Sequence, residues 1–183
     1  MKQVFWFLLE IIQVVVIALV VVLPIRYFVF QPFVVKGASM EPNFHDGDYL
    51  VVDELSYRFK DPQRGEVVVF RYPKDESQRF IKRVIGLPGE QLDLNGSTIR
   101  ITKADGQVVD LDEAKYLPKL IYFTEQKIIL TKDEFFVLGD NRFHSFDSRG
   151  WGLVKRNEII GRVAVRLWPF TAIDYLLEPA YNN

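Results

Sequence analysis

Cysteine is absent from this 183-residue chain, and only two histidines and two methionines occur. Without cysteine the chain has no disulfide, no thiol nucleophile and no thiolate metal ligand. The formal net charge of −1 shows no excess of basic residues, which argues against nucleic-acid binding. A chain without cysteine remains compatible with an oxidising extracytoplasmic space, so this absence alone does not identify the compartment.

The chain contains enough apolar residues to form a hydrophobic core. Hydrophobic residues make up 49% of the chain and charged residues 26%, a balance that disordered chains do not have. The length fits one domain of ordinary size with a small extension.

The extension is the apolar run "VFWFLLEIIQVVVIALVVVLPI" at 4–25, interrupted by Glu10 and Gln13. A helix of about 20 apolar residues crosses the hydrocarbon core of a bilayer. A cleaved signal peptide is the alternative, but its apolar core is about 7–15 residues and ends in small residues, which are missing here. The pattern therefore favours a single-pass membrane anchor over 1–30, followed by a folded domain over 31–183.

The charges that flank this run do not settle its orientation. Lys2 precedes it, and Arg26 and Lys36 follow it, so the positive charges are nearly balanced.

Short β-branched and aromatic runs, separated by Gly, Asn, Asp and Pro, predict a mainly β, antiparallel domain. Asp105-Gly106 lies between two such runs and is a strong hairpin signal. The polar stretch 91–128 is predicted to be a small β-rich insertion. The aromatics of "LWPF" at 167–170 belong either to the core or to a lip resting on a membrane, and we favour the core.

Ser39, in "KGASMEPNF", is either a turn residue or a nucleophile, and a nucleophilic hydroxyl needs a base. His144 lies close to Asp147 and Ser148, so a serine–histidine–aspartate triad is conceivable. A histidine in a polar loop is more often solvated, however, and the same applies to His45. The pattern disfavours a histidine-based triad.

Lys82, in "RFIKRVIGLPGE", is the other candidate base. A lysine must lose its proton to act as a base, and burial in apolar surroundings lowers its pKa. Lys82 follows Phe80 and Ile81 in a predicted strand, where alternation would turn Arg83 outward. The alternative, that Lys82 is the polar side of an edge strand, stays open.

The segment "GDNRFHSFDSRGWG" has a high density of opposite charges between glycines, namely Asp140, Arg142, Asp147 and Arg149. It is either a surface loop whose ion pairs contribute little stability, or a support that orients a catalytic base.

Four segments, in this order, resemble type I signal peptidases, the membrane-anchored Ser-Lys proteases that remove signal peptides from exported proteins. They are "GASMEPNF" at 37–44, "RGEVVVF" at 64–70, "KRVIGLPGE" at 82–90 and "GDNRFHSFDSRGWG" at 139–152. The resemblance covers nearly the whole chain and implies a β-rich catalytic core with a smaller β-rich insertion.

The resemblance also implies roles for individual residues. Ser39 is the expected nucleophile, the backbone at Ser39 and Gly37 is expected to form part of the oxyanion hole, and Lys82 is the expected general base. Met40 is expected to pack beside the nucleophile, near the substrate pockets. Ser145 is expected to hydrogen-bond the lysine amine, and Asp147 and Arg149 to form a bracing ion pair. Asp140, Asn141 and Arg142 match a structural part of the same loop.

Three positions depart from the usual pattern of the family. Gly37 stands where many members have a serine or threonine whose hydroxyl assists the oxyanion hole, and a missing donor costs about 10²–10³ in rate. Asn43 replaces a threonine and His144 an asparagine, and neither change removes a proposed catalytic group.

The expected function is cleavage of signal peptides that have small residues before the cut, without a metal or cofactor. The expected partners are preproteins, the lipid bilayer and the protein-export machinery, with the catalytic domain on the extracytoplasmic side. Two alternatives stay open: a Ser-Lys protease that cleaves itself or a regulatory partner, and a membrane-tethered β module without enzyme activity.

Overall fold

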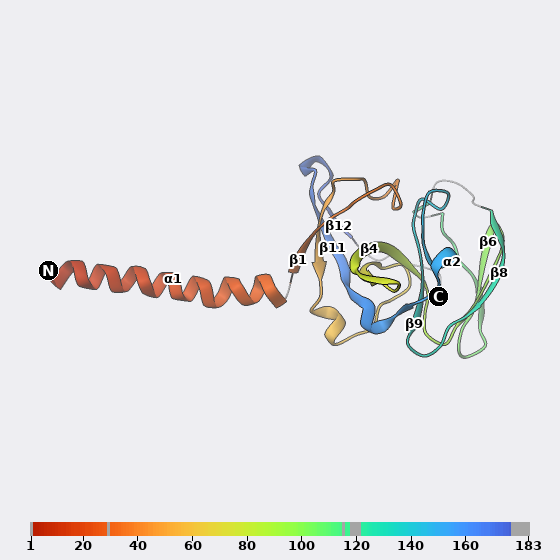
Figure 1. Ribbon diagram of the computed structural model, residues 1–183, viewed down its shortest axis with the longest axis horizontal. Helices are drawn as coiled ribbons and strands as arrows, with labels where there is room; N and C mark the ends of the chain where they lie inside the picture. The colour runs from red at the N-terminus through yellow and green to blue at the C-terminus, as the bar shows by residue number, and fades with distance from the viewer. Residues whose placement is uncertain (1, 29, 115, 118–121, 177–183) are drawn as a thin grey trace.

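The computed structural model describes residues 2–28, 30–114, 116–117 and 122–176. Helix α1 (Lys2–Phe28) comes first and projects away from a body made mainly of β-strands (Figure 1). At 1.5 Å per residue its 27 residues extend about 40 Å. Its described side chains, from Trp6 to Val20, are exposed. Within the described part of the chain, no helix has the length and apolarity required to cross a membrane.

The larger sheet is antiparallel and contains parts of two of the four segments that resemble the family, those at 64–70 and 82–90. Its strand order is β1-β2-β11-β3-β4-β9-β10, and β12 pairs with β11. The strands are β1 (Phe30–Val34), β2 (Tyr49–Asp53), β3 (Val67–Tyr72), β4 (Asp75–Gly86), β9 (Glu134–Leu138), β10 (Val154–Lys155), β11 (Ile159–Trp168) and β12 (Asp174–Tyr175).

Strand β4 is the longest strand in the described chain, with twelve residues, and it joins the two halves of this sheet. It pairs with β3 along most of its length, but with β9 only from Arg83 to Gly86. The first half of β4 therefore has one edge without a strand partner among the described residues. That edge forms part of the candidate site.

A second antiparallel sheet has the order β7-β6-β5-β8. It is built from β5 (Gln91–Gly96), β6 (Thr98–Thr102), β7 (Val108–Asp110) and β8 (Phe123–Ile129). The hairpin expected at Asp105-Gly106 joins β6 to β7, where the N–H of Lys103 bonds the carbonyl of Gln107 at 2.8 Å. Gly106 has φ +85°, a left-handed conformation that glycine adopts readily. The mainly β, antiparallel prediction is confirmed.

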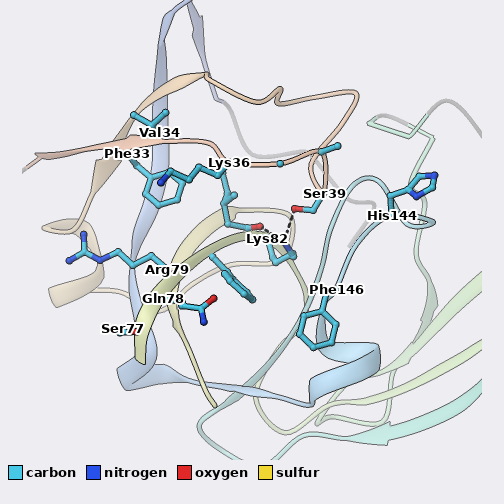
Figure 2. Close-up of a pocket in the computed structure, with 14 residues that line it drawn as sticks. Phe33, Val34, Lys36, Ser39, Ser77, Gln78, Arg79, Lys82, His144 and Phe146 are labelled. Carbon is cyan, nitrogen blue, oxygen red and sulfur yellow. Dashed lines mark hydrogen bonds between the residues drawn. The ribbon is translucent and has the colours of Figure 1, made fainter. Parts of the chain in front are cut away.

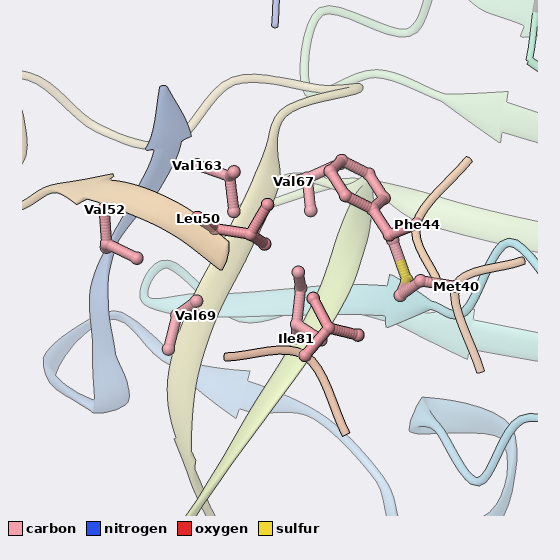
Figure 3. Packing of buried hydrophobic residues seen from close by; sticks show 9 residues of the cluster. Met40, Phe44, Leu50, Val52, Val67, Val69, Ile81 and Val163 are labelled. Atoms are coloured by element: carbon pink, nitrogen blue, oxygen red, sulfur yellow. The ribbon is translucent and has the colours of Figure 1, made fainter. Parts of the chain in front are cut away.

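Strand β3 is buried on both faces, which explains its uninterrupted apolar run. Val67 and Val69 pack in one core cluster, together with Met40, Phe44 and Ile81 (Figure 3). Val68 and Phe70 face a second cluster on the other side of the sheet. A third cluster lies between the two sheets and contains residues of both, such as Leu92 and Phe136.

The helical elements after α1 are short: α2 (Ser148–Trp151), η1 (Ser56–Arg58), η2 (Arg156–Glu158) and η3 (Phe170–Ala172). The core location favoured for "LWPF" is wrong. Leu167 and Trp168 are 48% exposed and Phe170 is 72% exposed. Beyond Arg162, β11 no longer pairs with β3, but it stays paired with β2 up to Trp168 and with β12 at Val165 and Arg166 (Figure 1). These strand pairings leave the side chains of Leu167, Trp168 and Phe170 exposed.

Candidate active site

Ser39 lies in a tight turn that follows β1. The N–H groups of Asn43 and Phe44 both bond the carbonyl of Met40, at 3.1 and 3.0 Å. Met40 and Phe44 are buried in the core, so the turn is held from below by apolar packing (Figure 3). Met40 is therefore next to Ser39 in sequence but buried beneath it, and its expected place near the substrate pockets stays a prediction.

The Lys82 side chain reaches Ser39 from β4. Its Nζ donates a hydrogen bond to Ser39 Oγ at 2.7 Å and another to the carbonyl of Ile81 at 2.8 Å (Figure 2). Lys82 is only 4% exposed. The structure thus joins two residues that are 43 positions apart, and the edge-strand alternative for a solvated Lys82 is wrong.

Burial has the largest effect on the proton affinity of this amine. Desolvation lowers the pKa of Lys82 from its ordinary 10.5 to about 8, while the charges of Asp147 and Asp140 act in the opposite direction. At neutral pH about a tenth of such an amine carries no proton. A neutral amine within hydrogen-bond distance of a hydroxyl can accept its proton.

The loop after β9 packs directly against the Ser39 turn. Asn141 bonds both neighbouring carbonyls, its N–H to Ser39 and its side-chain amide to Ala38, each at 3.0 Å. Gly139 lies at this contact, where a Cβ would collide with the carbonyl of Ser39 and the side chain of Ser145. The close approach of the two loops thus requires glycine at position 139.

Ser145 does not make the expected hydrogen bond with Lys82. Its Oγ is buried and has no hydrogen-bond partner among the described residues. The Lys82 amine instead bonds Ser39 and the Ile81 carbonyl, and Ser145 packs against Gly139.

Asp147 and Arg149 form an ion pair with two hydrogen bonds, each of 2.8 Å. Asp147 also accepts a hydrogen bond from the N–H of Gly139 at 3.1 Å, and its side chain caps α2. These contacts fix both ends of the loop that holds Ser145.

Arg83 is not turned outward, as alternation had suggested. It lies on the opposite side of β4 from Lys82, but it is also buried and forms a bidentate pair with Asp140 at 2.8 and 2.6 Å. Asn43 donates to the same carboxylate at 2.8 Å and to the carbonyl of Tyr116 at 2.9 Å. The Tyr116 ring lies 4.2 Å from the Arg83 guanidinium.

The segment between β7 and β8, which contains Glu113 and Tyr116, thus covers the face of β4 on which Arg83 lies. Glu113 pairs with Arg142 through two hydrogen bonds of 2.8 and 2.7 Å, and these attach the segment to the loop after β9. No sequence signal had marked Glu113 or Tyr116, because their contacts depend on how the second sheet folds back.

Gly37 contributes no hydroxyl, and its N–H is already bonded to the Asp46 carboxylate at 2.6 Å. The N–H of Ser39 has no acceptor among the described residues, so it is available to an incoming oxyanion. Of the two expected backbone positions, Ser39 has a free donor and Gly37 does not.

A cleft of about 730 Å³ opens beside Ser39 and Lys82. Figure 2 shows the end of β1, with Phe33 and Val34, on one side and the start of β4 on the other. The edge strand β1 and the unpaired half of β4 both border it. Sequence alternation had not identified Phe33 or Phe146 as cleft residues.

The two histidines do not contact Ser39. His144 is on the rim of the cleft with its ring turned away from the hydroxyl, and His45 is exposed (Figure 2). The described residues contain no group of three or more His, Asp or Glu side chains placed to hold a metal ion.

Comparisons with known proteins identify the family of the chain. Residues 8–168 match the family described as "Signal peptidase, peptidase S26". A probable signal peptidase I-2 of Synechocystis is 34% identical, with 94% of this chain and 78% of the relative covered. A signal peptidase I of Leptolyngbya laminosa is 37% identical, with 94% and 85% covered. A crystal structure of a signal peptidase I from Enterococcus faecalis has 32% identity and a TM-score of 0.47, with 57% of this chain and 97% of that chain covered.

The sequence matches show that the chain is a serine endopeptidase. The chain belongs to the signal peptidase family, peptidase S26. The resemblance to type I signal peptidases found from the sequence is confirmed, and this conclusion depends on the sequence matches.

Proposed function

We propose that this protein is a membrane-anchored enzyme that removes signal peptides from exported preproteins with a Ser39–Lys82 dyad. The observation that carries the proposal is the 2.7 Å contact between Lys82 Nζ and Ser39 Oγ at the side of the cleft. The names of the relatives, which are signal peptidases, support the substrate class.

In the proposed first step, neutral Lys82 takes the proton of Ser39 as the oxygen attacks the carbonyl carbon of the scissile bond. The N–H of Ser39 donates to the resulting oxyanion. Lys82 then gives its proton to the leaving amine, the C–N bond breaks, and an acyl-enzyme ester remains on Ser39.

In the second step, Lys82 takes a proton from a water molecule that attacks the ester. The ester bond breaks, Ser39 regains its proton from Lys82, and the signal peptide leaves with a new carboxylate. Every proton is carried by Lys82, so the scheme needs no metal or cofactor.

We further propose that the substrate lies extended between β1 and the unpaired half of β4. Both edges offer main-chain groups, so the peptide can add a strand to the sheet. Phe33, Val34 and Phe80 provide apolar walls near Ser39. Small side chains such as alanine, at the first and third positions before the cut, suit this narrow space.

Membrane attachment is the remaining part of the proposal. The apolar run at 4–25 supports an anchor, and the exposed aromatics Trp168, Phe170 and Tyr175 support a lip that touches the lipid surface. The catalytic domain would then face the extracytoplasmic side, where exported preproteins emerge from the export machinery. The full chain should remain in the membrane pellet after alkaline carbonate extraction, and its release would contradict the anchor.

An active-site serine probe separates this enzyme from a binding module of the same fold. The probe should acylate Ser39 in the full chain and should fail to label the Lys82→Ala variant, in which the base is missing. Labelling that is equal in both chains would contradict the dyad. The probe would also acylate a protease that only cleaves itself, but such a protease would leave an added preprotein intact in detergent extracts.

A further inference from the structure

Two positive side chains line the cleft at the end away from Ser39. Lys36 follows β1 on one wall and Arg79 lies on β4 on the opposite wall, and Figure 2 shows both side chains pointing toward that end. Both are exposed. Arg79 reaches across to Gln31 on β1, with Nη1 3.4 Å from Oε1. An amide partner leaves the charge of the guanidinium uncompensated.

No carboxylate balances these charges inside the cleft. None of the described residues that line it is Asp or Glu. Glu54 is within electrostatic reach of Arg79, but it is also within reach of Arg58 and Arg71, so one negative charge faces three positive ones. Burial raises the pKa of Glu54, which weakens its compensating charge further. The lining of this end therefore contains two positive charges and no negative charge, and the neighbouring Asp75 carboxylate, which bonds Ser77 and Gln78, offsets only part of this positive charge.

The position of Arg79 gives the distance between this positive charge and the scissile bond. Arg79 is three residues before Lys82 on the same strand, and strand residues are about 3.3 Å apart, so the separation is about 10 Å. An extended substrate that runs along β4 covers this distance with about three residues. A side chain three or more residues from the cut can thus approach both cations.

We propose that Lys36 and Arg79 form a subsite for acidic residues, which selects preproteins that carry Asp or Glu about four to six residues before the cleavage point or about three to five residues after it. The inference depends on the proposal that this cleft binds the substrate. The subsite adds a preference to the requirement for small residues at the cut, because Arg79 lies about 10 Å from Lys82 along β4 and the Lys36 side chain points away from Ser39 (Figure 2).

The test is cleavage of synthetic signal-peptide substrates by the full chain in detergent. A reference peptide has glutamine at the tested positions, and each further peptide replaces one glutamine with glutamate, from the fourth to the sixth residue before the cut and from the third to the fifth after it. Exposed ion pairs are weak, so glutamate at one or more of these positions should raise kcat/KM about two- to fivefold at low salt. The gain should shrink near 1 M salt, where charges are screened over about 3 Å.

The Arg79→Gln and Lys36→Gln variants should each reduce the ratio of kcat/KM for the glutamate peptide to kcat/KM for the reference peptide, measured within the same variant, and the double variant should bring this ratio close to one. Arg71→Gln is the matched control, because Arg71 is also exposed, also acts on Glu54 and also makes one 3.4 Å bond, but does not line the cleft. Equal kcat/KM for the glutamate and reference peptides in the unmodified enzyme would overturn the subsite. A preference for the glutamate peptide that survives the double substitution would also overturn it. Failure to cleave even the reference peptide would contradict the proposed function, and the subsite with it.

Discussion

Arg83 and Asp140 form a buried bidentate ion pair that links the strand of Lys82 to the loop that packs on Ser39. Removal of one partner of a buried ion pair is strongly destabilising, because the charge of the other partner is left buried without compensation. Asn43 adds a third hydrogen bond to the same carboxylate.

We therefore expect Arg83→Met and Asp140→Leu each to lower the free energy of unfolding by about 3–5 kcal/mol. The double variant should lose much less than the sum, because it leaves no unpaired charge. Denaturant unfolding, followed by circular dichroism, measures the free energy of unfolding of the two single variants and of the double variant. Losses that simply add would show that the two residues do not act as a pair.

The activity of the enzyme should depend on pH through Lys82. Burial lowers the pKa of its amine to about 8, and only the neutral form accepts the Ser39 proton. The kcat/KM value should therefore rise about tenfold per pH unit below 8 and level off above it. Lys36→Gln, which removes an exposed lysine of the same cleft, should leave the midpoint unchanged. A flat profile between pH 6 and 9 would exclude Lys82 as the titrating base.

Gly139→Ala should disrupt the site through a steric effect. The new methyl group would collide with the Ser39 carbonyl and with the Ser145 side chain, so the two loops must separate. We expect a loss of at least about 10²-fold in kcat, because small displacements of a reacting group are costly. Gly150→Ala, at an exposed position of α2 where the nearest neighbour is 3.3 Å away, is the control. Equal activity in both variants would contradict the close packing.

Ser145 provides a subtler test. A buried hydroxyl without a partner requires an explanation, and we expect that it bonds the Lys82 amine once Ser39 turns toward the substrate. Ser145→Ala should then lower kcat about tenfold, the effect of one lost hydrogen bond, with little change in KM. Ser77→Ala, an exposed serine of the same cleft, should have no such effect. An unchanged kcat for Ser145→Ala would assign the residue a packing role only.

Local sequence patterns were sufficient to predict the β architecture. The apolar run of β3 and the Asp105-Gly106 hairpin depend on neighbouring residues alone, and both appear where expected. The apolar strand context made Lys82 a candidate base, but the choice of Lys82 as the partner of Ser39 depended on the family resemblance, since 43 residues separate them. Their contact depends on strand pairing and on the Met40 anchor beneath the turn, neither of which a linear pattern contains.

Two of the wrong predictions, for Arg83 and for the aromatics of "LWPF", have one physical cause, which is packing by distant segments. Alternation correctly placed Arg83 opposite Lys82, but it could not show that Asp140 and Tyr116 cover that side. Conversely, Trp168 and Phe170 are aromatic residues of the kind that usually lie in a core, yet no described segment covers them.

The most direct test of the dyad is cleavage of one signal-peptide substrate by the full chain and by its Ser39→Ala and Lys82→Ala variants. Circular dichroism should show the same β content in all three, and each variant should lose at least about 10³-fold in kcat, because the two residues act as a unit. Cleavage by the folded Lys82→Ala variant at the rate of the unmodified enzyme would contradict the account.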